Sequence, residues 1–346
     1  MLTLIMNIVN NYQEQETLRN RIIQRLVASR GKYLSGHEIG TELGISRTAV
    51  WKHVEALRRE GFRVSSQTNR GYRLDGLPDV ISPSAVQAVL KTRCFGKNIL
   101  HFPILDSTQE TASEAARKGA PEGTVVIAEQ QRNGRGRRGR TWVSPQGGLW
   151  FSLVLRPPLH PQKATIITLA AGVAVAKSIK NLGKLPVMLK WPNDVLVAEK
   201  KIAGILGEMV AETDTLHMII LGMGINVNVE KTGLPPELHG TATSLSLELG
   251  RKIDRGEFFG NLLENCEVYY DLLLSGGAEP VLKAWRSMPN ILGRQVKAET
   301  PEGLCLGRAV DIDPQGALLI EDAGGKTSRI LAGDIIMVRG EGGRLS

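Results

Sequence analysis

Cysteine is scarce in this chain of 346 residues. Cys94, Cys266 and Cys305 are odd in number, lie far apart in the sequence, and never form a C-x-x-C pair. A disulfide framework and a cysteine-based zinc site are therefore not expected. Unpaired thiols favour a reducing compartment, so we expect a cytoplasmic protein.

Long hydrophobic runs are missing as well. The longest, residues 164–176, lies between Lys163 and Lys177 and is too short to cross a bilayer. It predicts a buried helix, and we expect no membrane association. The opening residues carry neither a basic leader nor a small-residue cleavage site, so we expect no secretory signal.

Neither sign of charge dominates strongly, since the net charge is +8. The excess is not concentrated in one place, since residues 1–80 hold 12 Lys/Arg against 8 Asp/Glu and the remainder holds 31 against 27. The excess positive charge gives mild support for a polyanionic partner. Tandem repeats and low-complexity segments are absent from the sequence. The content of 42% hydrophobic residues, together with the length, predicts a globular protein of two or three domains.

Residues 16–76 predict a winged helix-turn-helix domain. A helix is expected from about residue 16 to 29. Ser35-Gly36-His37-Glu38 then matches the S-x-x-E capping box that opens a second helix, which Gly44 ends. Ser46 is placed to cap a third helix directly after that turn, as in helix-turn-helix motifs.

The third helix has the pattern of a DNA-reading helix. Its apolar residues recur at Val50, Val54 and Leu57, which leaves basic residues on the outer face. A charged helical face alone would indicate only solvated surface, but here two short strands around a polar turn follow it and predict a wing. The side chains expected to contact DNA are Arg47, Thr48, Lys52 and Arg70.

Residues 82–288 mix predicted strands and helices with hairpin-like connections. This pattern favours a largely antiparallel or mixed sheet over regular βαβ repeats. From residue 290 to 346, short strands separated by glycine turns predict a small β-barrel, with separate strands at 303–307 and 309–312. The expected fold class is α+β with three domains, at residues 16–76, 82–288 and 290–346.

A basic loop at Gly134–Arg140 holds four arginines interleaved with three glycines. Glycine permits close approach of the backbone to a ligand, and guanidinium grips phosphate or carboxylate. A mobile lid that closes on an anion is one interpretation. A solvated surface loop, or an arginine–glycine segment that binds nucleic acid through charge, is the other.

Four further segments accompany the basic loop, at Asp106–Thr108, Lys190–Asp194, Lys200–Leu206 and Gly222–Val227. With the winged helix and the barrel, they closely resemble the bifunctional biotin–protein ligases that double as biotin-operon repressors. The resemblance covers nearly the whole chain from about residue 20. Gln109, where family members often have Asn, and the pair Arg132-Asn133 depart from the family pattern.

The resemblance implies a central core like that of class II aminoacyl-tRNA synthetases, an SH3-like C-terminal barrel, and a two-step reaction. Biotin and ATP form biotinyl-5′-AMP with Mg²⁺, and a lysine of a biotin carboxyl carrier protein, a subunit of acetyl-CoA carboxylase, then receives the biotin. Biotinyl-AMP also acts as corepressor, favouring a homodimer that binds operator DNA. Because the biotin carboxylate is already ionised near neutral pH, the first step needs fixed cations and no general base.

The resemblance also assigns roles to individual residues, with Arg137 and Lys201 as the catalytic cations. Asp194 is the expected metal ligand, although an Asn-Asp pair is also ordinary turn chemistry. Biotin contacts are expected from Ser107, Thr108, Gln131, Arg135, Arg137, Lys201 and Gly204. ATP or adenylate contacts are expected from Arg137, Arg138, Trp142 and Asn226.

Neighbours of these residues are expected to be structural. We expect Trp191 in the core, and Lys190 and Lys200 as surface charges. Two other functions stay open on the sequence: a lipoate-type ligase of the same fold, and a ligand-sensing transcription factor without catalysis. The latter would keep the helix-turn-helix but has no need of Gln131 and Lys201 in one site.

Overall fold

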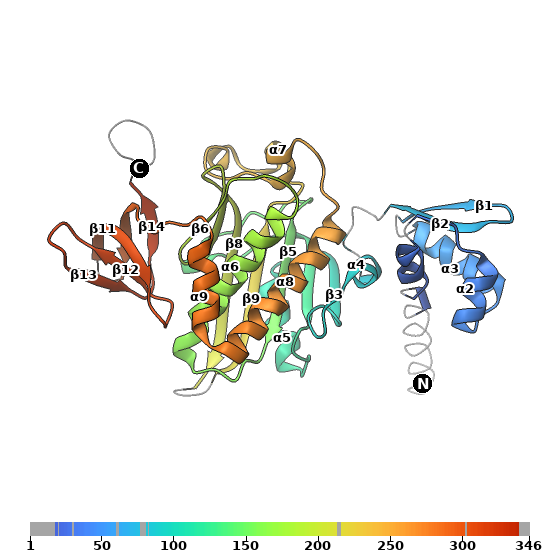
Figure 1. Ribbon diagram of the computed structural model, residues 1–346, viewed down its shortest axis with the longest axis horizontal. Helices are drawn as coiled ribbons and strands as arrows, with labels where there is room; N and C mark the ends of the chain where they lie inside the picture. The colour runs from blue at the N-terminus through green and yellow to red at the C-terminus, as the bar shows by residue number, and fades with distance from the viewer. Residues whose placement is uncertain are drawn as a thin grey trace. The chain divides into compact units, whose positions relative to one another are not determined.

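The structure is a computed structural model in which the chain divides into two compact units (Figure 1). One comprises Met1–Lys97 with Asp254–Asn261, and the other Asn98–Ile253 with Leu262–Ser346. Our division into three domains is finer and stays a prediction. The structure describes residues 18–19, 21–29, 31–59, 62–76, 81, 83–212, 216–301 and 303–338. The predicted start of the first helix, at residue 16, lies outside them.

The N-terminal part of the first unit is a helix-turn-helix with a wing. A helix at residues 21–28 precedes α2 (Gly36–Leu43) and α3 (Arg47–Arg59). The predicted capping box is present at α2, and Gly44 ends this helix in the left-handed conformation with φ 68°. These local signals place the turn between α2 and α3.

The core of this unit forms where the helices face one another. Val50, Val54 and Leu57 are fully buried on α3, as the spacing predicts. The wing is the antiparallel pair β1 (Arg63–Gln67) and β2 (Gly71–Gly76). The short helix α4 (Pro83–Val89) follows.

The second unit is built on a seven-stranded mixed sheet with the strand order β3-β4-β5-β9-β8-β7-β6. Only β3 and β4 pair in parallel within it, so the predicted mixed character is confirmed. Its strands are β3 (Ile99–Leu105), β4 (Val125–Gln131), β5 (Leu149–Leu155), β6 (Val187–Lys190), β7 (Asp194–Val197), β8 (Lys200–Ala211) and β9 (Leu216–Ile225).

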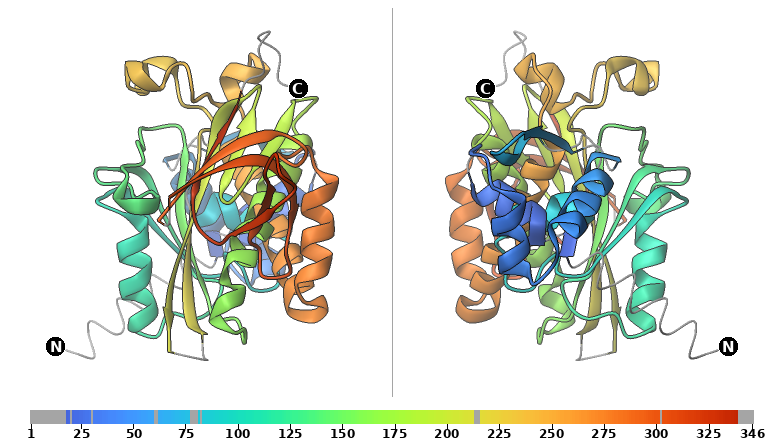
Figure 2. Two further views of the ribbon diagram at one scale, coloured as in Figure 1. Left: turned by 90° about the vertical axis from the view of Figure 1, so that its left-hand side faces the viewer. Right: turned by 90° about the vertical axis from the view of Figure 1, so that its right-hand side faces the viewer.

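Helices cover the two faces of this sheet (Figure 2). On one face α5 (Thr108–Arg117) packs on β4, β5 and β9. On the other, α6 (Ala164–Lys180) packs on β6, β7 and β8 and against α9 (Ala278–Ser287). The remaining helices are α7 (Leu245–Leu249) and α8 (Arg255–Gly276). The apolar run predicted to be buried forms α6, and none of the helices in the described residues could span a membrane.

The C-terminal strands form a five-stranded antiparallel sheet in the order β13-β12-β11-β10-β14. The two separate strands expected at 303–307 and 309–312 were wrong, because β11 runs through both and accommodates a register shift between Ala309 and Asp311. The strands are β10 (Gln295–Thr300), β11 (Gly303–Ile312), β12 (Leu318–Glu321), β13 (Thr327–Ile330) and β14 (Asp334–Met337). The α+β fold class is confirmed.

Candidate active site

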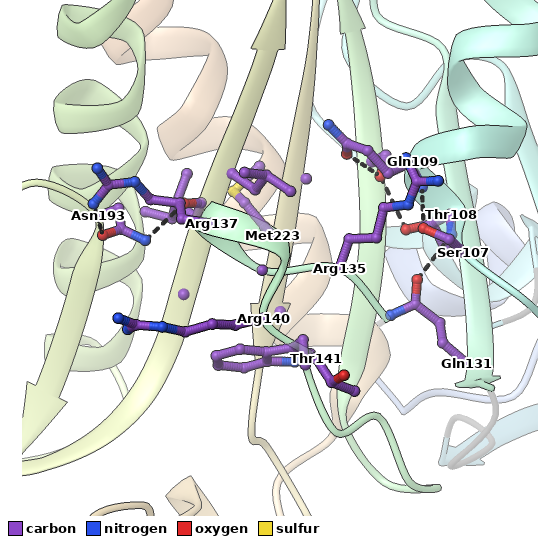
Figure 3. Close-up of a pocket in the computed structure, with 18 of the residues that line it drawn as sticks. Ser107, Thr108, Gln109, Gln131, Arg135, Arg137, Arg140, Thr141, Asn193 and Met223 are labelled. Carbon is purple, nitrogen blue, oxygen red and sulfur yellow. Dashed lines mark hydrogen bonds between the residues drawn. The ribbon is translucent and has the colours of Figure 1, made fainter. Parts of the chain in front are cut away.

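A cavity of about 140 Å³ lies on the α5 face of the mixed sheet (Figure 3). The N-terminus of α5, the basic loop, and strands β8 and β9 surround it. The cavity brings together segments from across the ligase-like core. The sequence-predicted residues that line it are Ser107, Thr108, Gln131, Arg135, Arg137, Trp142, Asp194, Lys201 and Gly204.

Two predicted residues lie elsewhere. Asn226 lines a second cavity, which shares Trp142, Asp194 and Lys201 with the first. Arg138 lines neither cavity.

The basic loop folds as a tight hairpin at the end of β4. Gly134 accepts a backbone hydrogen bond from Trp142, Gly136 donates one to Arg140, and Arg135 bridges Thr141. A side chain at residue 134 would place its Cβ 2.3 Å from the Trp142 carbonyl oxygen, so only glycine fits there. The hairpin thus fixes the backbone positions from which the arginine side chains extend.

Ser107 and Thr108 are held at the start of α5. Ser107 is the N-cap, and its hydroxyl accepts from the Gln109 backbone N–H. The Thr108 N–H donates to Gln131 Oε1 at 2.8 Å, and Gln131 Nε2 donates to Ser144 Oγ at 2.8 Å. Helix start and loop base therefore present their polar atoms as one cluster.

Arg137 is the most enclosed of the loop arginines. Its Nη1 donates to Asn193 Oδ1 and to the Gly333 carbonyl, each at 3.2 Å. Burial lowers the pKa of the Arg137 guanidinium, although the carboxylates of Asp334 and Asp194 act against that shift. A cation held in a desolvated place exerts a stronger field on a bound anion than one in water.

The other arginines of the loop are already paired with acids. Arg135 pairs with Glu110 on α5. Arg138 and Arg140 both pair with Asp334 on β14, and Arg138 also donates to the Glu299 carbonyl at 3.3 Å.

Lys201 also lines the cavity and is held in place by several contacts. Its Nζ lies 2.7 Å from Asp194 Oδ1. Its backbone N–H donates to the Thr241 carbonyl at 2.7 Å, and its carbonyl accepts from Thr243 at 3.0 Å. Lys201 and Arg137 therefore form two anchored positive charges beside one space.

Trp142 lies flat over two glycines of the sheet. Added Cβ atoms at Gly204 and Gly224 would approach its ring to 2.7 and 2.4 Å. The Lys201 ammonium sits 5.1 Å from the ring centroid, within cation–π range. The two glycines leave room for the Trp142 indole, which lines both cavities.

Apart from Asp194 Oδ1, which pairs with Lys201, two buried polar atoms beside the second cavity have no hydrogen-bond partner among the described residues. They are Trp142 Nε1, a donor, and Asn226 Oδ1, an acceptor. The Asn226 amide is oriented because its Nδ2 donates to the Thr243 carbonyl at 2.9 Å. A buried donor and acceptor left unpaired suit a flat heterocycle such as a purine, which offers both kinds of partner.

The described residues contain no group of three or more His, Cys, Asp or Glu side chains placed to hold a metal ion. Two carboxylates line the cavity: Asp194, which pairs with Lys201, and Asp334, which pairs with Arg138 and Arg140. Mg²⁺ takes few protein ligands when substrate phosphates supply the rest, so this donor set fits a phosphate-borne Mg²⁺ and no self-contained metal site.

The residues predicted to contact DNA lie in the first unit and are exposed. Arg47, Thr48 and Lys52 share the outer face of α3. Arg70 sits at the wing turn with its guanidinium 4.8 Å from the Tyr33 ring centroid. The stacking holds a basic side chain of the wing in an extended position.

Sequence reasoning missed several residues of the site. Lys190 was expected at the surface, but it lines the second cavity, and burial lowers the pKa of its ammonium group. Asp334 and Asn193 bind loop arginines from distant positions in the sequence. Trp191 is buried, as expected. No periodic pattern marks these contacts, because tertiary neighbours create them.

Three segments of the chain match known families. Residues 101–226 match the Biotin/lipoate A/B protein ligase family, residues 18–73 an HTH domain, and residues 291–338 the Biotin protein ligase C terminal domain. The three matches follow the order of the elements described above.

Relatives cover nearly the whole chain. The bifunctional ligase/repressor BirA of Bacillus subtilis is 41% identical over 93% of this chain and 99% of its own length. The Escherichia coli protein of the same name is 32% identical over 88% of this chain and 94% of its own. The chain therefore belongs to the biotin protein ligase family, among its bifunctional ligase/repressor members. The resemblance inferred from the sequence is confirmed.

A solved structure shares the fold of much of this chain. The biotin protein ligase from Aquifex aeolicus in complex with biotin and ATP is 31% identical, with a TM-score of 0.61. It covers 70% of this chain and 100% of its own.

Proposed function

We propose that this protein activates biotin with ATP and transfers it to a lysine of a biotin carboxyl carrier protein. The observation that carries the proposal is the placement of Arg137 and Lys201, two anchored cations, beside one cavity. In the first step a biotin carboxylate oxygen attacks the α-phosphorus of ATP, and pyrophosphate departs. In the second the carrier lysine amine attacks the mixed anhydride, and AMP departs.

The chemistry of the first step suits this charge distribution. Carboxylate and α-phosphate repel each other, and negative charge grows on the departing pyrophosphate. Fixed cations at both sides of the reacting atoms lower that barrier without reorganising. Biotin's ring would meet the polar cluster of Ser107, Thr108 and Gln131, and ATP would place its adenine near Trp142 and Asn226.

We propose that Mg²⁺ accompanies ATP, bound mainly to its phosphates, with Asp194 as the protein carboxylate nearest to them. The ion would neutralise phosphate charge and support the leaving group. Arg138 and Arg140, tied to Asp334, anchor the loop that excludes water from the adenylate.

The helix-turn-helix gives the second part of the proposal, biotin-responsive repression of biotin synthesis genes. Arg47, Thr48, Lys52 and Arg70 would bind operator DNA. Bound biotinyl-AMP would favour a homodimer, and so raise DNA affinity by a coupling free energy. The carrier would be the acetyl-CoA carboxylase subunit, and the compartment the cytoplasm.

One experiment tests the ligase part. The purified protein is incubated with biotin, ATP, Mg²⁺ and a recombinant carrier domain, and biotin on the carrier is detected with streptavidin. We expect label that requires ATP and disappears when the carrier lysine is replaced by arginine. A parallel reaction with lipoate in place of biotin is followed by the mass of the carrier. Transfer of lipoate but not of biotin would identify the lipoate-type alternative, and no transfer of either would favour the non-catalytic one.

A second experiment tests the repressor part. Dimerisation is followed by sedimentation with and without biotin plus ATP, and binding to the promoter of biotin synthesis genes by fluorescence anisotropy. Both affinities should rise together when biotinyl-AMP forms. Equal dimerisation constants in the two conditions would contradict the linkage.

A further inference from the structure

A network of three buried polar side chains, Thr108, Ser152 and Gln109, forms part of the lining of the first cavity. The Thr108 hydroxyl lies 2.9 Å from the Ser152 hydroxyl, which donates to Gln109 Oε1 at 3.0 Å. Gln109 Nε2 in turn donates to the Ile220 carbonyl at 2.8 Å. All three side chains are at least 96% buried, and a Cβ at Gly222 would come within 2.5 Å of Gln109 Oε1.

The hydrogen bonds among Thr108, Ser152 and Gln109 fix the positions of their protons. The Ile220 carbonyl can only accept, so the Gln109 amide must turn its nitrogen toward it and its oxygen toward Ser152. Ser152 therefore gives its proton to Gln109. Because a hydroxyl has one proton, Thr108 must donate to Ser152, and its oxygen can only accept from a ligand.

Neighbouring side chains are fixed in the opposite sense. Gln131 Oε1 accepts from the Thr108 N–H, and one Nε2 proton goes to Ser144, so the other Nε2 proton is left for the cavity. Ser107 Oγ accepts from the Gln109 N–H, so its own proton can point to a ligand. The cluster thus offers two donors beside one acceptor.

We propose that Gln109 and Ser152 are positioning residues that make Thr108 an obligate acceptor, and so restrict the cavity to a ligand with a ring N–H beside a carbonyl. A cyclic urea has this pattern: its carbonyl accepts from Ser107 and Gln131, and its N–H donates to Thr108. The proposal rests on the proposed function, and it adds the groups that enforce the choice of ring.

Removing either positioning residue changes the polarity of Thr108 while the Thr108 side chain itself stays in place. In Ser152→Ala, Thr108 loses its acceptor and can turn its proton into the cavity. In Gln109→Met, Ser152 loses its acceptor and can donate to Thr108, with the same result. A ring oxygen facing Thr108, which repels its lone pairs in the wild type, then becomes a hydrogen-bond acceptor.

The test uses biotin and the two cyclic carbamate isomers in which one ring N–H is replaced by oxygen. Dissociation constants are measured by calorimetry for the wild type, both variants and the control Ser178→Ala. Ser178 is buried on α6, where its hydroxyl donates to the Ala174 carbonyl. Thermal unfolding of each variant monitors folding.

We expect the wild type and the control to prefer biotin over one carbamate isomer by about a hundredfold. In Ser152→Ala and Gln109→Met that preference should fall about tenfold, because biotin binds more weakly while the affinity for that isomer is not reduced. Equal loss of affinity for biotin and both isomers, or an unchanged preference, would overturn the proposed role of Gln109 and Ser152. If the wild type does not bind biotin, the proposed function itself fails, which is a distinguishable result.

Discussion

Asp334 accepts a hydrogen bond from Arg138 at 3.2 Å between Oδ2 and Nη1, across 196 residues of sequence. The same carboxylate pairs with Arg140, while the adjacent Gly333 carbonyl binds Arg137. The first residue of β14 and the residue before it therefore bind three arginines of the loop that borders the cavity. The C-terminal sheet therefore helps to hold the basic loop in its place at the cavity.

Asp334→Asn should loosen the loop over the reaction intermediate. The carboxylate charge of both ion pairs is lost. Because the arginines are partly exposed, we expect the closed loop to be destabilised by about 1 kcal/mol or less, which raises the hydrolysis rate by up to about fivefold. Biotinyl-AMP should then hydrolyse faster without carrier, which release of AMP measures. Asp313→Asn is the matched control, since Asp313 pairs with Arg329 away from the loop. An unchanged rate would argue against the anchoring role.

Arg137→Ala should lower the rate of adenylation about a hundredfold or more. This is the scale for removing one preorganised group that stabilises charge in a transition state. The burst of pyrophosphate from a single turnover measures the effect. Arg132→Ala, an exposed arginine before the loop that pairs with Asp106, should leave the burst intact. A normal burst in Arg137→Ala would remove this residue from the chemistry.

Asp194→Asn separates two roles of one carboxylate. If Asp194 assists Mg²⁺, the variant should need about tenfold more Mg²⁺ for half-maximal adenylation, because a hard cation prefers a charged oxygen ligand. If Asp194 only orients Lys201, 2.7 Å away, the rate falls at every Mg²⁺ concentration and the midpoint stays in place. A magnesium titration of pyrophosphate release reads both quantities, and we expect the first outcome.

Gly224→Ala should weaken ATP binding by displacing Trp142. The added Cβ would lie 2.4 Å from Trp142 Nε1, so the indole must leave its position over the sheet. We expect about a tenfold rise in the KM for ATP, the loss of a base–aromatic stacking contact. Gly172→Ala on α6, whose Cβ would meet only ordinary contacts at 3.7 Å or more, is the control. Comparable KM values in the two variants would exclude Trp142 as the adenine platform.

Arg47→Ala should weaken operator binding and leave biotin transfer unchanged. Arg47 opens α3 on its exposed face, where a cation neutralises phosphate or reads guanine. We expect a loss of about 1–3 kcal/mol of binding free energy, roughly 5- to 150-fold in affinity, and a changed salt dependence. Arg59→Ala, at the other end of the same helix, should behave like the wild type. Anisotropy titrations at several salt concentrations compare the two.

Local rules predicted much of this fold, and non-local contacts explain what they missed. Ser35 and Gly44 act through neighbours within four residues, so the capping box and the helix end were visible in the sequence. β11 continues past Gly307 because β10 and β12 pair along it, and a glycine there cannot reveal those partners.

The same distinction between local patterns and non-local contacts applies to the site. The cationic loop was recognisable from its composition and its family resemblance. The burial of Lys190 and the contact of Asp334 with the loop depend on strands that come together only in the folded chain. The direction of the Thr108 proton depends on Ile220, more than a hundred residues away.

Arg138 adopts φ 55° and ψ 36°, a left-handed backbone that costs a non-glycine residue about 1 kcal/mol or more. Glycine would avoid that cost, yet its place is taken by a guanidinium bound to β14 and β10. The C-terminal sheet is therefore not a detachable module. A shortened enzyme that stops at residue 288 would retain a strained loop tip without its counterpart, and a chimera with a foreign terminal sheet would need an acid at position 334.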